Sequence, residues 1–405
     1  MGHHTRLGLL PLVIILGSCG SSNPPAGPND PASSSGGKTA GSAGKSGGGS
    51  GGQTGAAGAT AAGGQGDTTP APPAGGSGGI PAAGGNDAAA ETSAPATPDA
   101  DSDATPDAPP ATVMPPVGVF PLEAIKAAKA ELYAKAGVHI EGPTWRDGEV
   151  FFAADGAGWG LMRVDANRKL YRYQPQLLPI GSALLADGSM LFGDHDLVVV
   201  QIFPDGKVAQ VNTDFAGQAI EFANDLSVDG AGNIYTSARH TGFIYRISPA
   251  GEVVRVASGL NVPNGVEVDP SSKYLYFVEG TAIKRLSLPA SGTAFGKPEM
   301  VIGGGQPDGM MFDAWGNLWF ADWGAGHLVV IGPDGKTITT VASGGAPINL
   351  CAGGKDNDTI FVATDFKGIY KIGPIPGFRG FLHPGAAKYP IKKMLDLVPA
   401  NTPVP

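Results

Sequence analysis

This sequence of 405 residues has few cysteines, few aromatic side chains (7%) and few charged ones (16%). Of its two cysteines only Cys351 lies in the part that we expect to fold, so that part has no internal disulfide and must depend on a large apolar core. The net charge is −9, and nothing in its distribution indicates a nucleic-acid partner. Apart from a short N-terminal stretch, no apolar run approaches the length of a transmembrane helix.

Residues 1–19 are typical of a bacterial export leader. Arg6 precedes a short apolar stretch at residues 7–16, and the ending Leu-Gly-Ser-Cys resembles the lipobox, in which the cysteine is acylated and becomes the first mature residue. The sequence therefore predicts a lipoprotein whose only membrane contact is a lipid at Cys19; an ordinary secretory leader with a chance cysteine is the alternative. Gly20, where Asp would signal retention, indicates the outer membrane or cell surface, with a periplasmic side also open.

Residues 20–117 consist mainly of Gly, Ala, Ser, Pro and Thr, with eight acidic residues against two lysines. Such a segment cannot bury enough apolar surface to offset its chain entropy, so we expect a disordered tether. The folded domain then comprises residues 118–405.

A turn motif recurs six times in this domain. Its aspartates are separated by 40, 42, 40, 44 and 43 residues and are Asp147, Asp187, Asp229, Asp269, Asp313 and Asp356. Each repeat has room for four short strands, which is the pattern of a propeller blade. The sequence therefore predicts an all-β, six-bladed β-propeller; a β-sandwich with accidental spacing is the alternative.

The ends of the domain are less regular. Residues 121–137, PLEAIKAAKAELYAKAG, begin with Pro121 and end with Gly137, which predicts one helix outside the ring with Leu122, Ile125 and Leu132 on one side. The fourth strand of the last blade is ambiguous, and either residues 388–395 or the segment near Val117 could supply it.

A polar residue precedes each turn, where the innermost strand of a blade should begin. Counting back from the turns gives Glu141, Ser182, Asn224, Asn264 and Asp308, and aligning the second strand of the last blade, whose turn is longer, with that of the fourth gives Asn349. Innermost strands line the central channel, so these side chains should converge at one face of the axis. Loops after the second strands should border the same face and bring His195, His240 and Trp323 there.

The chemistry of this ring favours a hard cation. Carboxylate and amide oxygens are ligands for Ca²⁺ first and for Mg²⁺ or Mn²⁺ next, and Zn²⁺ comes last because no His occupies the ring. The alternative is that these residues cap the starts of the strands by accepting hydrogen bonds from backbone N–H groups. This alternative leaves the two acids of the ring, Glu141 and Asp308, facing and repelling each other without an ion. The two histidines and Trp323 are either substrate contacts or ordinary loop residues, and Cys351 is predicted to be a small buried core residue.

Five segments resemble the gluconolactonase, regucalcin (senescence marker protein) and luciferin-regenerating enzyme family: EGPTW, NDLSVDGAGNIY, PNGVEVD, PDGMMFDAWGNLW and INLCAGGKD. The resemblance spans residues 139–373 and implies one divalent ion held by Glu141, Asn264 and Asp308, with Asn224 contacting ligand or metal. It also implies lactone hydrolysis, with organophosphates as substrates of some relatives, and Asp308 as the general base. The regucalcin branch has a basic residue where this chain has Phe222, which puts a substrate bound through that group in doubt.

These observations leave three functions open. The first is a metal-dependent hydrolase of sugar lactones, for which Ser182, Asn224 and Asn349 would also contact a small-molecule substrate. The second is a hydrolase of another ester class. The third is a membrane-tethered binding propeller that keeps a structural ion and catalyses nothing, since a fold alone does not fix function. We expect a monomer in each case.

Overall fold

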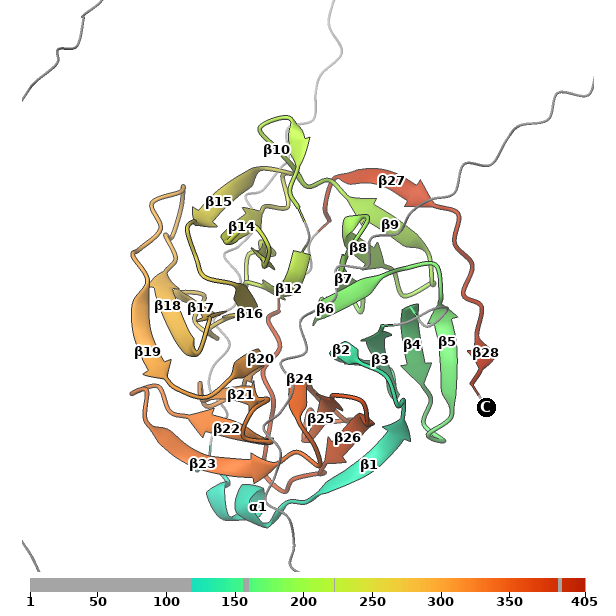
Figure 1. The fold of residues 1–405 in the computed structure, drawn as a ribbon, viewed down its shortest axis with the longest axis vertical. Coiled ribbons are helices and arrows are strands. Elements are labelled where there is room, and N and C mark those ends of the chain that lie inside the picture. The colour runs from blue at the N-terminus through green and yellow to red at the C-terminus, as the bar shows by residue number, and fades with distance from the viewer. Residues whose placement is uncertain (1–117, 156–159, 222, 385–387, 405) are drawn as a thin grey trace, which may run out of the picture. The chain divides into compact units, whose positions relative to one another are not determined.

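The computed structural model describes residues 118–155, 160–221, 223–384 and 388–404. The predicted leader with Cys19 and the predicted tether lie outside these residues. In the described part, six β-sheets surround a central axis, and the inner strand of each sheet lies against the inner strands of its two neighbours (Figure 1). The predicted six-bladed propeller is confirmed. No helix in this part of the chain is long and apolar enough to cross a membrane.

The first three blades are antiparallel sheets whose strands follow in chain order from the axis outward. Blade 1 contains β2 (Ile140–Arg146), β3 (Glu149–Ala154), β4 (Gly160–Val164) and β5 (Leu170–Gln174). Blade 2 contains β6 (Pro179–Leu184), β7 (Met190–Asp194), β8 (Val198–Ile202) and β9 (Val208–Val211). After a small hairpin of β10 (Asp214–Phe215) and β11 (Gln218–Ala219), blade 3 contains β12 (Ala223–Val228), β13 (Ile234–Ala238), β14 (Phe243–Ile247) and β15 (Val253–Ala257).

The last three blades repeat this order, except at the final outer strand. Blade 4 contains β16 (Pro263–Val268), β17 (Tyr274–Glu279), β18 (Ala282–Ser287) and β19 (Glu299–Gly303). Blade 5 contains β20 (Pro307–Phe312), β21 (Leu318–Asp322), β22 (His327–Ile331) and β23 (Thr337–Ala342). Blade 6 contains β24 (Pro347–Gly353), β25 (Thr359–Thr364), β26 (Gly368–Ile372) and, outermost, β1 (Ala130–Lys135).

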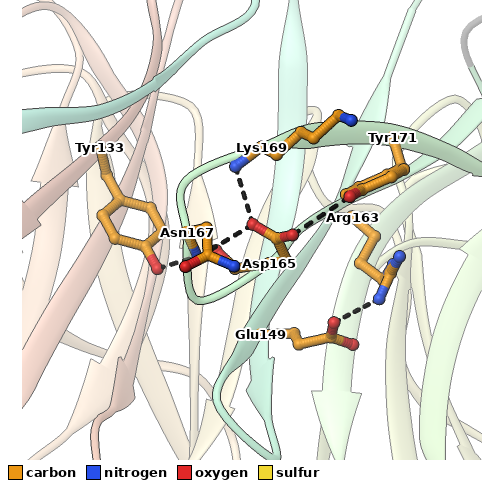
Figure 2. Close-up of polar contacts among 7 residues, drawn as sticks. All are labelled: Tyr133, Glu149, Arg163, Asp165, Asn167, Lys169 and Tyr171. Atoms are coloured by element: carbon orange, nitrogen blue, oxygen red, sulfur yellow. Dashed lines mark hydrogen bonds and ion pairs between the residues drawn. The ribbon is translucent and has the colours of Figure 1, made fainter. Parts of the chain in front are cut away.

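Four of the recurring aspartates stabilise their own turns, because each accepts the backbone N–H of the residue two positions later: Asp187, Asp229, Asp269 and Asp313. In the turn between β20 and β21, the carboxylate of Asp313 accepts hydrogen bonds from the backbone N–H groups of Trp315 and Asn317, each at 2.9 Å. The turn between β4 and β5 uses the same device, because Asp165 accepts from the N–H groups of Asn167 and Lys169 at 3.0 and 2.8 Å (Figure 2). These aspartates therefore have a structural role in the turns, and the candidate site residues lie at the other end of the inner strands.

The core consists of six apolar clusters, each between two neighbouring blades. Between blades 1 and 2, for example, Phe151 and Leu161 pack against Met190 and Phe192. This layering supplies the buried apolar area that a chain without disulfides requires.

The predicted helix at residues 121–137 is wrong beyond its first turns. α1 spans Leu122–Ala127 and buries Ile125 against blades 5 and 6, as expected. Residues 130–135 instead form β1, and Leu132 is 45% exposed. The open edge of β26 overrides the helix propensity of this segment, because each pairing residue satisfies backbone groups that β26 would otherwise leave unpaired.

The outermost strand of blade 6 is β1. The prediction that residues 388–395 or the segment near Val117 supply this strand is wrong. Residues 391–395 form β27 (Ile391–Leu395), a fifth strand on the edge of blade 2, while β28 (Thr402–Pro403) adds a fifth strand to blade 1 (Figure 1). β1 also contacts blade 1. The hydroxyl group of Tyr133 in β1 donates a hydrogen bond to the backbone carbonyl of Asp165, at 3.3 Å (Figure 2).

The segment between β26 and β27 crosses the turn end of the inner strands. Phe381 donates its N–H to the carbonyl of Phe312, and a ring nitrogen of His383 lies 3.2 Å from the carbonyl of Val268. Phe381 and His383 line a cavity of about 110 Å³ in the channel. This segment thus lies at the turn ends of the inner strands of blades 4 and 5, and the candidate site lies at the opposite end of these strands.

Candidate metal and substrate site

Every blade has a β-bulge where its inner strand begins. In blade 5, Pro307 pairs with Asp322 and Met310 pairs with Phe320, so Asp308 and Gly309 together face one residue. Bulges bend a strand and redirect its side chains. The bulges therefore define which residues occupy equivalent positions around the axis.

Asp308 is the second residue of its inner strand, and in the other blades this position is occupied by Glu141, Ile180, Asn224, Asn264 and Ile348. In blade 1 this residue is still paired, Glu141 with Ala153, and the bulge follows it. The polar ring thus comes from four blades, and the prediction that Ser182 and Asn349 complete it is wrong. Counting back from the turn fails in blades 2 and 6 because more residues separate bulge and turn there. Ser182 lies two residues further along its strand and donates to the carbonyl of Gly142 at 2.9 Å.

Asn349 belongs to a second layer, directly beneath the ring. The other members of this layer, at the position of Gly309, are Gly142, Gly181, Asp225 and Gly265. A Cβ atom at Gly181 would lie 2.2 Å from Oδ1 of Asp225, and one at Gly309 would lie 2.1 Å from Cγ of Asn349. The glycines therefore leave room for Asp225 and Asn349, which fill the channel below the ring.

Asp225 is the residue of this layer that sequence reasoning missed. It is 6% exposed, accepts the backbone N–H of Val266 at 3.2 Å and is hydrogen-bonded to Asn349. It immediately follows Asn224, so adjacency to a ring residue was the available signal. With Glu141 and Asp308, it places three carboxyl groups at one end of the channel.

The pKa values of these three carboxyl groups are all raised above those of exposed aspartate and glutamate side chains. Burial raises the pKa of Asp308 to about 7 against the lowering effects of Arg239, His139 and a hydrogen bond from Asn264. Burial also raises the pKa of Asp225 to about 7, with the charge of Asp308 adding to the shift. For Glu141, burial and then the charges of Asp308 and Asp225 raise the pKa well above its usual value. A site of this kind favours a bound cation, because a positive charge offsets both burial and mutual repulsion.

His139 and Asp365 form a second group that the sequence did not reveal. Nδ1 of His139 lies 2.8 Å from Oδ1 of Asp365, and its Nε2 lies 3.8 Å from Oε1 of Glu141. Burial lowers the pKa of His139, but the hydrogen bond and charge of Asp365, with Asp308 and Asp155, outweigh it and raise the pKa overall. The two residues are 226 positions apart, so no local pattern joins them.

The predicted loop residues lie as follows. Trp323 is 41% exposed and donates its Nε1–H to Oδ2 of Asp365 at 3.3 Å, so Asp365 positions both an imidazole and an indole. Burial lowers the pKa of His195, and the charge of His240 adds to this lowering, which puts these two histidines near each other. His240 is exposed, and its neighbour Arg239 was not singled out from the sequence. Phe222 lies outside the described residues.

The donor set fits a hard divalent cation. Glu141 and Asp308 offer carboxylate oxygens, and Asn224 and Asn264 offer amide oxygens. No group of three or more His, Cys, Asp or Glu in the described residues is arranged to hold a metal ion, so a cation here would depend on amides for part of its coordination. This composition agrees with Ca²⁺ and disfavours Zn²⁺.

Cys351 lies in β24 with a free thiol that is part-buried beside the cluster between blades 6 and 1, so the expected full burial is only partly met. Burial raises the pKa of this thiol. It is therefore a poor nucleophile, consistent with a packing role.

Fold and site together define a six-bladed β-propeller with an oxygen-ligand site at one mouth of its channel. The chain belongs to the SMP-30/Gluconolactonase/LRE-like family, whose sequence model matches residues 140–366. The family resemblance found in the sequence is confirmed.

Similar proteins include a pentonolactonase from Haloferax volcanii, 26% identical over 55% of this chain and 80% of that protein. A diisopropyl-fluorophosphatase from Loligo vulgaris is 27% identical over 43% of this chain and 67% of that protein. Regucalcin from Xenopus laevis is 26% identical over 56% of this chain and 84% of that protein.

Solved structures share the fold. A gluconolactonase from Xanthomonas campestris has a TM-score of 0.54 and 18% identity, covering 60% of this chain and 89% of its own. The calcium-binding protein regucalcin from Agrobacterium tumefaciens has a TM-score of 0.51 and 21% identity, covering 62% of this chain and 97% of its own. At these identities the likeness concerns the fold alone.

Proposed function

We propose that this protein is a metal-dependent hydrolase of sugar lactones. The observation that carries the proposal is that Glu141, Asn224, Asn264 and Asp308 each occupy the second position of the inner strand of their blade. The lactonases and the phosphatase among the relatives support hydrolysis, and the carboxylate and amide oxygens of the ring support Ca²⁺ as the ion.

In this proposal Asp308 is the general base. A bound divalent cation would polarise the lactone carbonyl and lower the pKa of Asp308, so that the carboxylate is ionised at neutral pH. Asp308 takes a proton from the attacking water while the water oxygen bonds to the carbonyl carbon. The ring C–O bond then breaks, Asp308 returns its proton to the ring oxygen, and a hydroxy acid is released.

The remaining site residues have supporting roles. Asp225 and Asn349 hold the floor beneath the ring, and Asn224 faces ligand or metal. We propose that Trp323, fixed by Asp365, stacks on the sugar ring, and that His195 and His240 contact its hydroxyl groups. Ser182, which bonds a backbone carbonyl, is assigned a structural role.

The test combines calcium titration by calorimetry with hydrolysis of aldonolactones and aryl esters, with and without chelator. Asp308→Asn should lose calcium affinity and stay about 10²- to 10⁴-fold slower at saturating calcium, because an amide cannot accept the proton. Glu141→Gln should lose similar affinity but regain more activity. Equal rescue of both variants by calcium contradicts the base role of Asp308. Calcium binding without turnover of any substrate would indicate a binding propeller instead.

We also propose export and anchoring through a lipid at Cys19, on the basis of the leader pattern in residues 1–19. Cys19→Ala should release the protein from membranes, as measured by fractionation and mass spectrometry of the lipid. Membrane association of that variant, with no lipid on the unmodified chain, contradicts the proposal.

A further inference from the structure

Phe366 exposes its aromatic side chain at the end of the channel where the polar ring lies. It belongs to the turn of residues 365–367 between β25 and β26, and its side chain is 66% exposed. The centroid of its phenyl ring lies 6.3 Å from that of the imidazole of His139, and Nε2 of this imidazole lies 3.8 Å from Oε1 of Glu141. One imidazole therefore separates Phe366 from a carboxylate of the polar ring.

The backbone of Phe366 adopts the left-handed conformation, with φ +53°. This conformation is unfavourable for a bulky side chain, because the Cβ atom lies too close to the backbone, and it favours glycine. The turn between β17 and β18, at the equivalent place in blade 4, has Gly280 there with φ +60°. Unfavourable backbone conformations of this kind cluster at ligand-binding sites. The turn itself is thus better served by glycine, which indicates that the phenyl ring has a use of its own.

The surroundings hold Phe366 in this position. Within the turn, the N–H of Lys367 donates to the carbonyl of Thr364 at 3.2 Å. The preceding residue, Asp365, accepts the Nε1–H of Trp323 at 3.3 Å. The two exposed aromatic side chains, Phe366 and Trp323, therefore border the same carboxylate and form one apolar side of the channel mouth.

The chemistry of a phenyl ring limits what it can bind. It has no hydrogen-bonding group, so covering it is favourable only for an apolar partner. Because His139 lies between Phe366 and Glu141, a lactone that is opened at the polar ring reaches Phe366 only through a group attached to the lactone ring.

We propose that Phe366 binds an apolar substituent of the substrate, an alkyl or aryl group attached to the lactone ring. This inference rests on the proposed lactone hydrolysis and narrows its substrate class to lactones with an apolar group beyond the ring. In this arrangement Trp323 faces the lactone ring and Phe366 faces the substituent.

The experiment measures kcat/KM at saturating calcium for δ-lactones that carry alkyl chains of increasing length, with gluconolactone as the polar reference. Phe366→Gly removes the phenyl ring and suits the left-handed backbone, and Phe366→Leu keeps an apolar side chain. Met300→Ala, which removes an exposed apolar side chain from β19 at the outer edge of blade 4, is the control.

In the unmodified protein, kcat/KM should rise by up to about fourfold for each methylene group that is buried. Phe366→Gly should flatten this rise, leave kcat/KM for gluconolactone within about twofold, and keep the melting temperature, because glycine relieves the backbone. Phe366→Leu should retain part of the rise, and Met300→Ala should retain all of it.

An unchanged dependence on chain length in Phe366→Gly contradicts the inference. An equal fall of kcat on every lactone, gluconolactone included, also contradicts it, since it would show that Phe366 only positions His139 and Asp365.

Calorimetric binding of an alkyl δ-lactam, which resembles the lactone but resists hydrolysis, separates this inference from the proposed function. Binding of the lactam that depends on Phe366, without hydrolysis of any lactone, refutes the proposed function and retains the apolar subsite. Hydrolysis of lactones, with lactam binding that is indifferent to Phe366, refutes the subsite and retains the proposed function.

Discussion

Removing one carboxylate from the ring should stabilise the cation-free protein. Asp308 has a pKa of about 7 in the folded chain, against 3.8 for an ordinary aspartate. Between these values the folded protein keeps a proton that the unfolded chain releases. The free energy of unfolding therefore falls as pH rises from about 4 to about 7, and the cost is fully present above pH 7.

The magnitude follows from the size of this shift. About three pKa units at about 1.4 kcal/mol each give at most about 4 kcal/mol at alkaline pH. Asp308→Asn removes this cost and also relieves Glu141 and Asp225, because the charge of Asp308 is a cause of their raised pKa values. The amide keeps an oxygen that can accept the hydrogen bond from Asn264. For a domain of this size, the variant should melt roughly 10 °C higher at pH 8 in chelator.

The assay is thermal unfolding at pH 5 and pH 8, in chelator and in calcium. The difference between Asp308→Asn and the unmodified protein should shrink at pH 5, where the carboxyl group of Asp308 is protonated in the folded state. Calcium should stabilise the unmodified protein more than the variant, because the ion binds the intact ring more tightly. Asp356→Asn, which changes an exposed aspartate in the turn between β24 and β25, is the control. A chelated protein that is as stable at pH 8 as at pH 5, or a variant that melts lower at pH 8, refutes the reasoning.

Three further outcomes follow from contacts in the structure. Asp365→Asn should lower the pKa of His139, since it removes the hydrogen bond and charge that raise it, and NMR titration of the His139 ring measures this; an unchanged titration contradicts the pairing. Gly309→Ala should cost about 1–3 kcal/mol in urea unfolding and weaken calcium binding because its Cβ meets Asn349. Gly303→Ala, whose Cβ would make only an ordinary contact with Sδ of Met300 at 3.9 Å, should cost much less. Deleting residues 118–137 removes the outer strand of blade 6 and should abolish cooperative unfolding, as seen by calorimetry; a sharp transition near the original melting temperature would show that β1 is dispensable.

The sequence predicts the blades because the same aspartate turn recurs between the first two strands of successive blades. The aspartate that accepts the N–H groups of its own turn is visible as a motif, and its period gives the number of blades. The ring residues of blades 1, 3, 4 and 5 follow by counting back from those turns. The method fails in blades 2 and 6, where Ile180 and Ile348 occupy the bulge, because the bulge is defined by pairing with the next strand and not by distance from the turn.

Other features depend on contacts between distant segments. Residues 130–135 have helix-forming composition, and only the edge of β26 makes them a strand. The pairing of His139 with Asp365 joins blade 1 to blade 6. The role of Asp225 depends on glycines in neighbouring blades that leave space for its side chain. None of these can be deduced from a repeat pattern, since each requires the closed ring.

Closure by β1 has a consequence for how the chain folds. Ala130, near the start of the domain, pairs with Ile372, near its end, while β27 and β28 return to blades 2 and 1 (Figure 1). Pairings of such large sequence separation form late and make folding slow. During synthesis, β1 has no partner until blade 6 has emerged, so its edge stays open to pairing with other chains. Once both ends are in place, strands from opposite termini form the outer edges of the two blades that meet at the seam, β1 on blade 6 and β28 on blade 1, so fraying of the N-terminal segment alone leaves blade 6 without its outer strand.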